Sequence, residues 1–353
     1  MKKCHIAYLA CAAALMGAGI GAAPPAAVPR VHVVLPGQSI QKAVDAAVAG
    51  DTVQLLSGTY HESVEISTSG VTLRGLGSRT VIRPAAEKAA GTCAQSGNGI
   101  CVTGTADRSV ENVTVASLTV TGFTRSGLFA TETDRLNVRK VTATENGVWG
   151  IAQEHSVRGE FRRNTVRNNG DAGLFLANAV AREDGASDSQ GAVVAHNRME
   201  GNRIGVTVRR LRNLVVAGNQ ITGNCAGVFV VGDENTPKAG ALTVAGNLVV
   251  ANNKSCPKTA RLEALQGSGI VVTGAEETLV TRNLVRDNAG TSSLSGGIVL
   301  FKSFVGSANE RNRISGNVLD GNSPADLVNT DPAATTNIFE HNNCRASQPE
   351  GLC

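Results

Sequence analysis

The chain has 353 residues, of which 42% are hydrophobic, 18% are charged and 3% are aromatic, and its formal net charge is +4. Steady apolar content and 40 glycines without a Gly-X-Y period exclude disordered and collagen-like chains. A charge this small, with no basic cluster interleaved with aromatics, argues against a nucleic-acid partner. Abundant Gly, Asn, Thr and Val disfavour long helices and suit many short strands separated by tight turns.

The first residues predict a secretory signal peptide over residues 1–23. Two lysines precede an apolar run from Ile6 to Ile20, and small residues follow it up to Ala23. A membrane anchor is the alternative, but the run is short for a bilayer span. We therefore expect a secreted or periplasmic protein with no membrane span. Cleavage would lower its formal charge to about +2, because both lysines leave.

Residues 31–353 are predicted to form one domain, because no linker divides them. Near the start of this domain, apolar residues at helical spacing predict a short helix over about Ser39 to Ala49. One face of this helix is expected to be apolar as far as Val48. The pair Gly50-Asp51 is expected to end the helix.

One unit then recurs six times: asparagine, four residues, asparagine, with an apolar residue at its third position. The copies are Asn164–Asn169, Asn197–Asn202, Asn219–Asn224, Asn247–Asn252, Asn283–Asn288 and Asn317–Asn322. A β-rich run usually precedes the unit, and a glycine-led run such as Gly205-Val-Thr-Val follows most copies. Weaker copies come earlier, so regular coils are expected over about residues 110–340.

The unit predicts a parallel β-helix, in which each coil is a few short strands joined at corners. No coil can bury its own apolar face, but coils stacked about 4.8 Å apart bury a continuous column. Asparagine tolerates left-handed backbone at a corner, and stacked asparagines can hydrogen-bond in a ladder. The end coil needs a cap, which the Ser39–Ala49 helix would supply. A sandwich of unrelated strands is the alternative.

Six of the eight cysteines remain once the signal peptide is removed. Six cysteines allow 15 connectivities, so we choose the pairing on proximity alone. The predicted pairs are Cys93 with Cys101, Cys225 with Cys256, and Cys344 with Cys353. Export favours disulfides over a metal cluster, and no pair has the Cys-x-x-Cys spacing of zinc or redox sites.

Four stretches resemble the opening of pectate-lyase-like right-handed β-helix proteins: Val34–Val44, Ala49–Leu55, Ser57–Val64 and Val71–Gly75. The asparagine-rich coils resemble the periplasmic copper-maturation and mannuronan epimerase β-helix families. The resemblance covers nearly all of the mature chain. It implies an all-β, single-domain, right-handed parallel β-helix solenoid with a short N-terminal capping helix.

The resemblance does not imply an activity, because this fold hosts lyases, hydrolases, epimerases and proteins with no known catalysis. The Asp-Pro-His-Asp of mannuronan epimerases, the Trp-Ile-Asp-His of pectate lyases and the Gly-His-Gly of polygalacturonases are all absent. No family site can therefore be transferred by motif.

The glycine-led strands form the candidate functional face, because insertions flank them and would build a groove. The insertions are Asn178–Gln190, Gly232–Gly240, Asn253–Ser268, Ala289–Gly296 and Lys302–Arg311. Alternation points one set of side chains inward: Val206, Val208, Val228, Val230, Ile270, Val272, Ile298 and Leu300. One outward column is then Phe129, Phe175, Thr207, Phe229, Val271 and Val299. The next is Thr131, Glu154, Ala177, Arg209, Val231, Thr273 and Phe301. A slip of one residue would reverse every assignment.

Polar residues of this face supply the candidate catalytic groups. Arg209 and Lys302 could neutralise the carboxylate of an acidic sugar, and Glu154 or His155 could move a proton. The candidate substrate-binding residues are Phe175, Arg210, Phe229, Asp233 and Phe301. The alternative is that the charges are solvated and the phenylalanines are packed against the solenoid. Glu154 and Asp233 could support glycoside hydrolysis, but they lie about three coils apart, which is too far.

No cofactor is expected, although the acids from Glu183-Asp184 to Asp188 give a weak indication of calcium. Copper handling is disfavoured, because methionine is scarce and no soft-ligand cluster appears.

Two functions remain open. One is a lyase or epimerase acting on extracellular acidic polysaccharide. The other is a non-catalytic β-helix that binds cell-envelope glycan or has a structural role. Only Trp149 and Tyr60 would serve sugar stacking after signal removal, which counts against tight binding. A monomer is expected.

Overall fold

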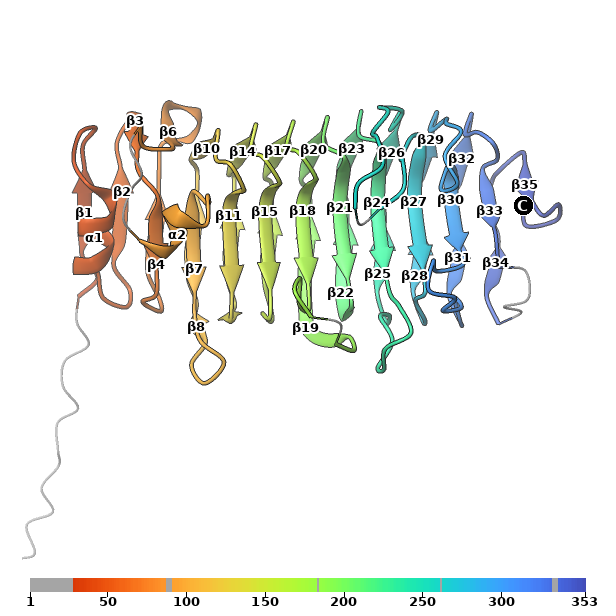
Figure 1. Ribbon diagram of the computed structural model, residues 1–353, viewed down its shortest axis with the longest axis horizontal. Helices are drawn as coiled ribbons and strands as arrows, with labels where there is room; N and C mark the ends of the chain where they lie inside the picture. The colour runs from red at the N-terminus through yellow and green to blue at the C-terminus, as the bar shows by residue number, and fades with distance from the viewer. Residues whose placement is uncertain (1–27, 87–90, 183, 261, 332–335) are drawn as a thin grey trace, which may run out of the picture.

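The structure, a computed structural model, describes residues 28–86, 91–182, 184–260, 262–331 and 336–353. The predicted signal peptide of residues 1–23 lies outside these ranges. Successive turns of chain stack along one long axis, and three parallel sheets run the length of the stack (Figure 1). The predicted all-β parallel β-helix is therefore confirmed.

Each coil between β2 and β33 contributes one strand to each of the three sheets, which we call sheets A, B and C. Sheet A has 12 strands in this order: β1 (Val31–Val34), β2 (Thr52–Leu55), β5 (Thr72–Arg74), β9 (Thr114–Ala116), β13 (Asn137–Arg139), β16 (Glu160–Arg162), β19 (Ser187–Ala195), β22 (Leu211–Ala217), β25 (Thr243–Ala245), β28 (Leu279–Thr281), β31 (Arg313–Ser315) and β34 (Ile338–Glu340). Sheet B has 10 strands: β3 (Gly58–His61), β6 (Thr80–Arg83), β10 (Thr119–Thr121), β14 (Thr142–Thr144), β17 (Thr165–Arg167), β20 (Arg198–Glu200), β23 (Gln220–Thr222), β26 (Leu248–Val250), β29 (Leu284–Arg286) and β32 (Val318–Asp320).

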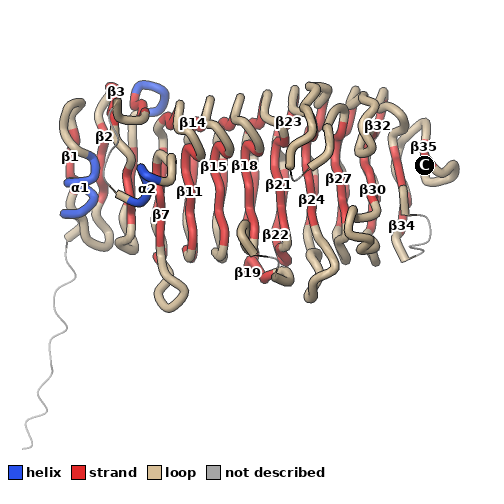
Figure 2. The backbone as a smooth tube through the Cα atoms, in the orientation of Figure 1, coloured by secondary structure: helices blue, strands red, loops and turns tan. Residues whose placement is uncertain are grey.

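Sheet C is built from the glycine-led strands and their neighbours. Its 11 strands are β4 (Val64–Ile66), β7 (Ile100–Thr103), β11 (Ser126–Thr131), β15 (Trp149–Glu154), β18 (Ala172–Ala177), β21 (Ile204–Arg209), β24 (Ala226–Val231), β27 (Ser268–Thr273), β30 (Gly296–Phe301), β33 (Leu327–Asn329) and β35 (Ser347–Gln348). A separate pair joins β8 (Val110–Glu111) to β12 (Thr133–Asp134). In the described part, helices occur only near the amino end: α1 (Ile40–Ala46), η1 (Gly77–Arg79) and α2 (Thr92–Gln95) (Figure 2).

The third residue of each asparagine unit points into the solenoid. Register pairs these residues along sheet B, and every one of them is buried: Val166, Met199, Ile221, Val249, Val285 and Leu319. Sheets A and C add buried aliphatic side chains to the same column. The coils therefore share one apolar interior, and each coil depends on its neighbours for burial.

Two asparagine ladders run along the corners on either side of sheet B. Asn219 is typical of the first ladder: its Oδ1 accepts from the backbone N–H and the Nδ2 of Asn197, at 2.9 and 3.0 Å. Its Nδ2 donates to the Val194 carbonyl and to Oδ1 of Asn247, both at 2.9 Å. The second ladder repeats this pattern from Asn146 to Asn322. The ladder predicted from the sequence is confirmed, and it satisfies buried polar groups at both corners.

The glycine that opens each long strand of sheet C is required by close packing. A Cβ on Gly205 would lie 2.5 Å from Cγ2 of Ile221 and 2.6 Å from the carbonyl oxygen of Gly227. The corner therefore has no space for a side chain, because it brings the backbone against the apolar core and the next coil.

Helix α1 covers the first coil and buries Ile40 and Val44, as the sequence predicts for a cap. It ends earlier than expected, because Ala47 is already extended and Val48 is exposed. The Asp51 carboxylate accepts from the Val48 backbone N–H at 3.1 Å, which fixes this exit. Hydrogen bonds from His32 and from two backbone N–H groups lower the pKa of Asp51 from 3.8 to about 2.

All three predicted disulfides are present. The Cα atoms lie 5.8 Å apart in Cys93–Cys101, 6.0 Å in Cys225–Cys256 and 5.4 Å in Cys344–Cys353. Disulfides persist in oxidising compartments, so their presence is consistent with export. No helix among the described residues has both the length and the apolar character needed to cross a membrane.

Candidate functional site

The register of sheet C confirms both outward columns predicted from alternation. Phe129 pairs with Ala152, and the column continues through Phe175, Thr207 and Phe229. The second column likewise runs from Thr131 to Phe301 along the same strands. The eight residues predicted to point inward all belong to the buried core.

The prediction of an open groove along this whole face is wrong for its carboxyl-terminal half. The insertions before β27 and β30 fold over the outward column and bury Leu265 and Leu294 against it. Phe229 is consequently only 4% exposed, and Phe175, which stacks on Trp149 instead, is only 8% exposed. The physical reason is that these insertions carry leucines of their own, which gain by covering exposed phenylalanine and valine. The alternative of phenylalanines packed over the solenoid therefore describes both residues.

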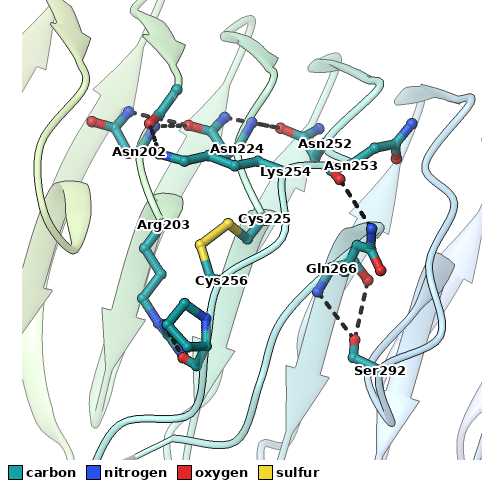
Figure 3. Close-up of a disulfide and its surroundings, with 12 residues drawn as sticks. Asn202, Arg203, Asn224, Cys225, Asn252, Asn253, Lys254, Cys256, Gln266 and Ser292 are labelled. Atoms are coloured by element: carbon teal, nitrogen blue, oxygen red, sulfur yellow. Dashed lines mark hydrogen bonds between the residues drawn. A yellow bond between two sulfur atoms is a disulfide. The ribbon is translucent and has the colours of Figure 1, made fainter.

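The loop that follows Asn252 is fastened over the sheet at several points (Figure 3). The Cys225–Cys256 disulfide ties it to the preceding coil. Arg203 donates to the carbonyls of Pro257 and Glu263, at 2.6 and 3.0 Å. Burial lowers the pKa of this Arg203 guanidinium. These contacts hold the loop as a fixed cover.

Two of the predicted catalytic residues are engaged with a different loop, which begins at Asn178. Glu154 accepts from the backbone N–H of Val180 at 3.0 Å, and Arg209 donates to the Ala179 carbonyl at 3.1 Å. The two residues lie two strands apart in sheet C, and both hydrogen-bond the backbone of this loop. Their polar atoms therefore position this loop.

Two predicted substrate-binding residues, Arg210 and Asp233, form an ion pair with each other. Their side chains are 5% and 13% exposed, and Arg210 also donates to the Arg182 carbonyl at 2.8 Å. Glu154 ends β15 and Asp233 follows β24, and these strands are three steps apart, about 14 Å at the strand spacing, as the sequence predicts.

Removing one partner of this buried pair should be costly. We expect Asp233→Ala to lower the free energy of unfolding by about 3–5 kcal/mol, because the guanidinium of Arg210 stays buried without its carboxylate. Urea denaturation of both proteins measures this. The double variant Arg210→Met/Asp233→Leu should recover most of the loss. A loss below about 1 kcal/mol for Asp233→Ala would show that the pair behaves as an exposed one.

The remaining predicted residues of the carboxyl-terminal half stand apart from the others. Phe301 packs against Phe304 with ring centroids 4.9 Å apart, and Lys302 is exposed directly after β30. Strand β30 lies three strands beyond β21 and five beyond β15, which is about 14 and about 24 Å. The structure therefore does not bring Lys302 together with Arg209 or His155.

The uncovered part of sheet C lies over β11, β15 and the start of β18, and we call it the open face. It consists of Arg125, Phe129, Thr131, Glu132, Glu154, His155 and Asp171, and the buried Trp149 and Phe175 border it. Phe129, Thr131, Glu132, Glu154 and His155 are all partly exposed.

One edge of the open face is aromatic. Trp149 stacks on Phe175 with ring centroids 4.5 Å apart and an interplanar angle of 16°. Arg125 lies over the indole ring at 5.6 Å, and the indole N–H donates to Asp171 at 3.2 Å. The indole is thus held at a fixed orientation by a cation, a carboxylate and a ring.

The opposite edge carries an acid and a histidine. His155 Nδ1 lies 3.3 Å from Oε1 of Glu132, and the two side chains are 27% and 25% exposed. Both residues have left-handed backbone, with φ of 47° and 52°, because they occupy the same turn position on successive coils. Nearby, Arg158 hydrogen-bonds Asp134 and lowers its pKa, so that carboxylate stays ionised. The Glu132–His155 pair is therefore the accessible proton-transfer group of this face.

Residues 66–253 and 184–304 match the family described as right handed beta helix region. The chain belongs to this family. No curated protein matches the chain in sequence.

Solved structures resemble this right-handed β-helix protein over most of its length. The mannuronan C-5 epimerase A-module of Azotobacter vinelandii is 18% identical, with 88% of this chain and 91% of that one covered at a TM-score of 0.59. The DFA-IIIase of Arthrobacter chlorophenolicus A6 is 13% identical, with 90% of this chain and 85% of that one covered at a TM-score of 0.59. The alginate lyase of Paenibacillus sp. str. FPU-7 is 15% identical, with 89% of this chain and 99% of that one covered at a TM-score of 0.52. At these identities the likeness establishes the fold alone.

Within the β-helix, the described residues form no group of three or more His, Cys, Asp or Glu side chains that could hold a metal ion. Of the acids that suggested calcium, Glu183 lies outside the described residues. Asp184 pairs with Arg182 at 3.3 Å, and Asp188 accepts from the Gln190 backbone N–H at 2.7 Å.

Sequence reasoning missed Arg125, Glu132 and Asp171 in this β-helix protein. Glu132 directly follows Thr131, which was placed in an outward column, and His155 directly follows Glu154 in the same column. Alignment of these two coils would have placed Glu132 beside His155. Arg125 and Asp171 offered no such signal, because each lies in a turn before its strand.

Proposed function

We propose that this protein is exported and modifies an acidic extracellular polysaccharide at the open face, as a lyase or an epimerase. The observation that carries the proposal is an exposed Arg125, fixed over Trp149, and an accessible Glu132–His155 pair on one stretch of sheet C. Both reactions begin by removing a proton beside a carboxylate, and a paired histidine suits that step.

The dimensions of the open face favour a polymer over a single sugar. Strand β15 has six residues, so Trp149 and His155 lie about 17–20 Å apart along the face. One sugar unit cannot reach both edges. The exposed guanidinium of Arg125, held over the buried Trp149 ring, would bind the carboxylate of one unit of an acidic chain, while His155 would act on another.

Export and the nature of the substrate have independent support. The predicted signal peptide and the three disulfides favour an oxidising compartment. Proteins that share the fold include a mannuronan C-5 epimerase and an alginate lyase, by name. Both names refer to polymers of acidic sugars.

The test is a screen of pectate, alginate and glycosaminoglycans with the purified mature protein, with and without calcium. Absorbance of unsaturated uronates reports a lyase, and proton exchange in heavy water followed by NMR reports an epimerase. We expect one polymer to give a product or an exchange signal. If no polymer gave unsaturated product or proton exchange, the enzymatic proposal would be contradicted.

A non-catalytic glycan-binding role is the second candidate. It is favoured by the engagement of Glu154 and Arg209 with the Asn178 loop, which leaves fewer polar groups for chemistry. A glycan array separates the two candidates. Specific binding that Arg125→Ala abolishes, without product from any bound polymer, would support the binding role.

A further inference from the structure

Five cations gather at the corner where sheet A meets sheet B, away from the open face. They are Arg139 and Lys140 at the end of β13, Arg162 and Arg163 at the end of β16, and Arg198 at the start of β20. Arg139 is the direct register partner of Arg162. Lys140 and Arg163 both adopt left-handed backbone, with φ of 54° and 57°, at the same turn position. We call this set the basic corner.

Most of the charge of the basic corner is unneutralised. Arg162 pairs with Glu160 and Arg198 pairs with Glu200, each at 2.9 Å. Within the described ranges, Arg139, Lys140 and Arg163 are exposed and have no ion-pair partner. The corner therefore keeps a net positive charge, although the mature chain is close to neutral overall.

The corner between sheets C and A shows that this chain does pair its charges elsewhere. There, Arg135 lies between Glu111 and Asp134, and Arg311 contacts Glu276 and Glu277 on the preceding coil. Like charges placed directly opposite on neighbouring strands are destabilising. The Arg139–Arg162 register keeps that repulsion, and Glu160 neutralises only Arg162, so Arg139 has no compensating carboxylate among the described residues. A local rule broken without internal compensation indicates a functional surface.

The spacing and position of the cations in the basic corner indicate which kind of anion would fit. Arg139-Lys140 and Arg162-Arg163 occupy the same turn on two successive coils, about 4.8 Å apart, which is close to the length of one sugar in an extended chain. They line a convex corner, so they suit a linear polyanion better than a small ion that needs enclosing. Phe161, the aromatic residue directly before Arg162, is fully buried and cannot stack on bases, which disfavours single-stranded nucleic acid.

We infer that the basic corner binds an acidic polysaccharide lying parallel to the solenoid axis, as a second surface distinct from the open face. Guanidinium and ammonium groups on successive coils contact carboxylates or sulfates on successive sugars. Arg74, exposed two strands earlier in the column of Arg139, extends the track toward the amino end. This binding does not depend on turnover at the open face.

The test compares two triple variants of the mature protein that lose the same charge. Arg139→Ser/Lys140→Ser/Arg163→Ser removes the unpaired cations of the corner. Lys42→Ser/Lys258→Ser/Arg345→Ser removes three exposed cations scattered over the surface. Affinity for alginate, for neutral dextran and for a single-stranded oligonucleotide is measured by calorimetry at 50 and at 200 mM salt, about the range in which polyanion binding is salt-sensitive.

We expect the corner variant to bind alginate about tenfold more weakly or worse, with a shallower salt dependence, and the scattered variant to stay within about twofold of wild type. The thermal midpoint of the corner variant without polymer should equal or exceed that of the wild type, because the repulsion between the cations of the corner is relieved. Equal alginate affinity of the corner variant and wild type would overturn the inference, as would tighter binding of the oligonucleotide than of alginate. Alginate binding that the corner variant loses, with no product or exchange signal from any polymer in the screen, would contradict the proposed function alone.

Discussion

Replacing Asn219 by alanine is expected to lower the free energy of unfolding by roughly 4 kcal/mol, one of the largest single-residue effects in this chain. Its side chain makes four hydrogen bonds, at 2.9 to 3.0 Å, and is buried between coils. Alanine would leave Asn197 without an acceptor for two donors, and Asn247 would lose a donor. Buried groups left unsatisfied cost about 1–3 kcal/mol each.

The matched control is Asn342→Ala, at the carboxyl-terminal end of the same ladder. Asn342 accepts the same two hydrogen bonds from Asn317, at 3.1 and 2.9 Å, but it is only half-buried. Water can replace its bonds, so we expect a loss of about 1 kcal/mol. Urea denaturation followed by circular dichroism measures both variants. Equal losses at the two positions would mean that burial of the ladder does not determine its contribution.

The ladder also explains why the fold could be predicted from sequence. In a solenoid, register follows from a repeat read along the chain, and asparagine, glycine and alternating valines each mark one position of the coil. Asn219 recurs as Asn247 because the same corner recurs, and Gly205 recurs as Gly227 for the same reason. The outward columns of sheet C followed directly from this periodicity.

What lies on top of the coils could not be predicted in the same way. The insertions that carry Leu265 and Leu294 do not repeat, so no periodicity placed them over Phe229 and Val299. Their position depends on contacts between side chains far apart in sequence, such as Arg203 with Pro257. The candidate site was consequently placed on the correct face but extended too far toward the carboxyl end.

The ion pair of Arg210 with Asp233 illustrates an intermediate case. Both residues were recognised as polar groups of the correct face. Their mutual contact requires knowing that they lie one coil apart, which the register of β21 and β24 provides. Counting coils along the sequence would therefore have identified Arg210 and Asp233 as an ion pair instead of as two separate sugar contacts.

The second large effect is expected at the open face. We expect His155→Gln to reduce turnover of the acidic polymer by about 10²–10⁴-fold, because the imidazole supplies the base and glutamine cannot accept the proton. Glutamine is compatible with the left-handed backbone at this position, since Gln190 of this chain adopts φ of 54°. Glu132→Gln should reduce turnover less, because its amide oxygen still accepts a hydrogen bond from the ring.

The control for this substitution is His341→Gln, which changes an exposed histidine with φ of 53° at the far end of sheet A. Initial rates on the polymer identified by the screen, with thermal midpoints for all three variants, give the comparison. His341→Gln should retain wild-type turnover. If His155→Gln also did so, the chemistry would not depend on the Glu132–His155 pair. The open face would then contribute binding through Arg125, because a guanidinium holds an acidic sugar without taking a proton from it.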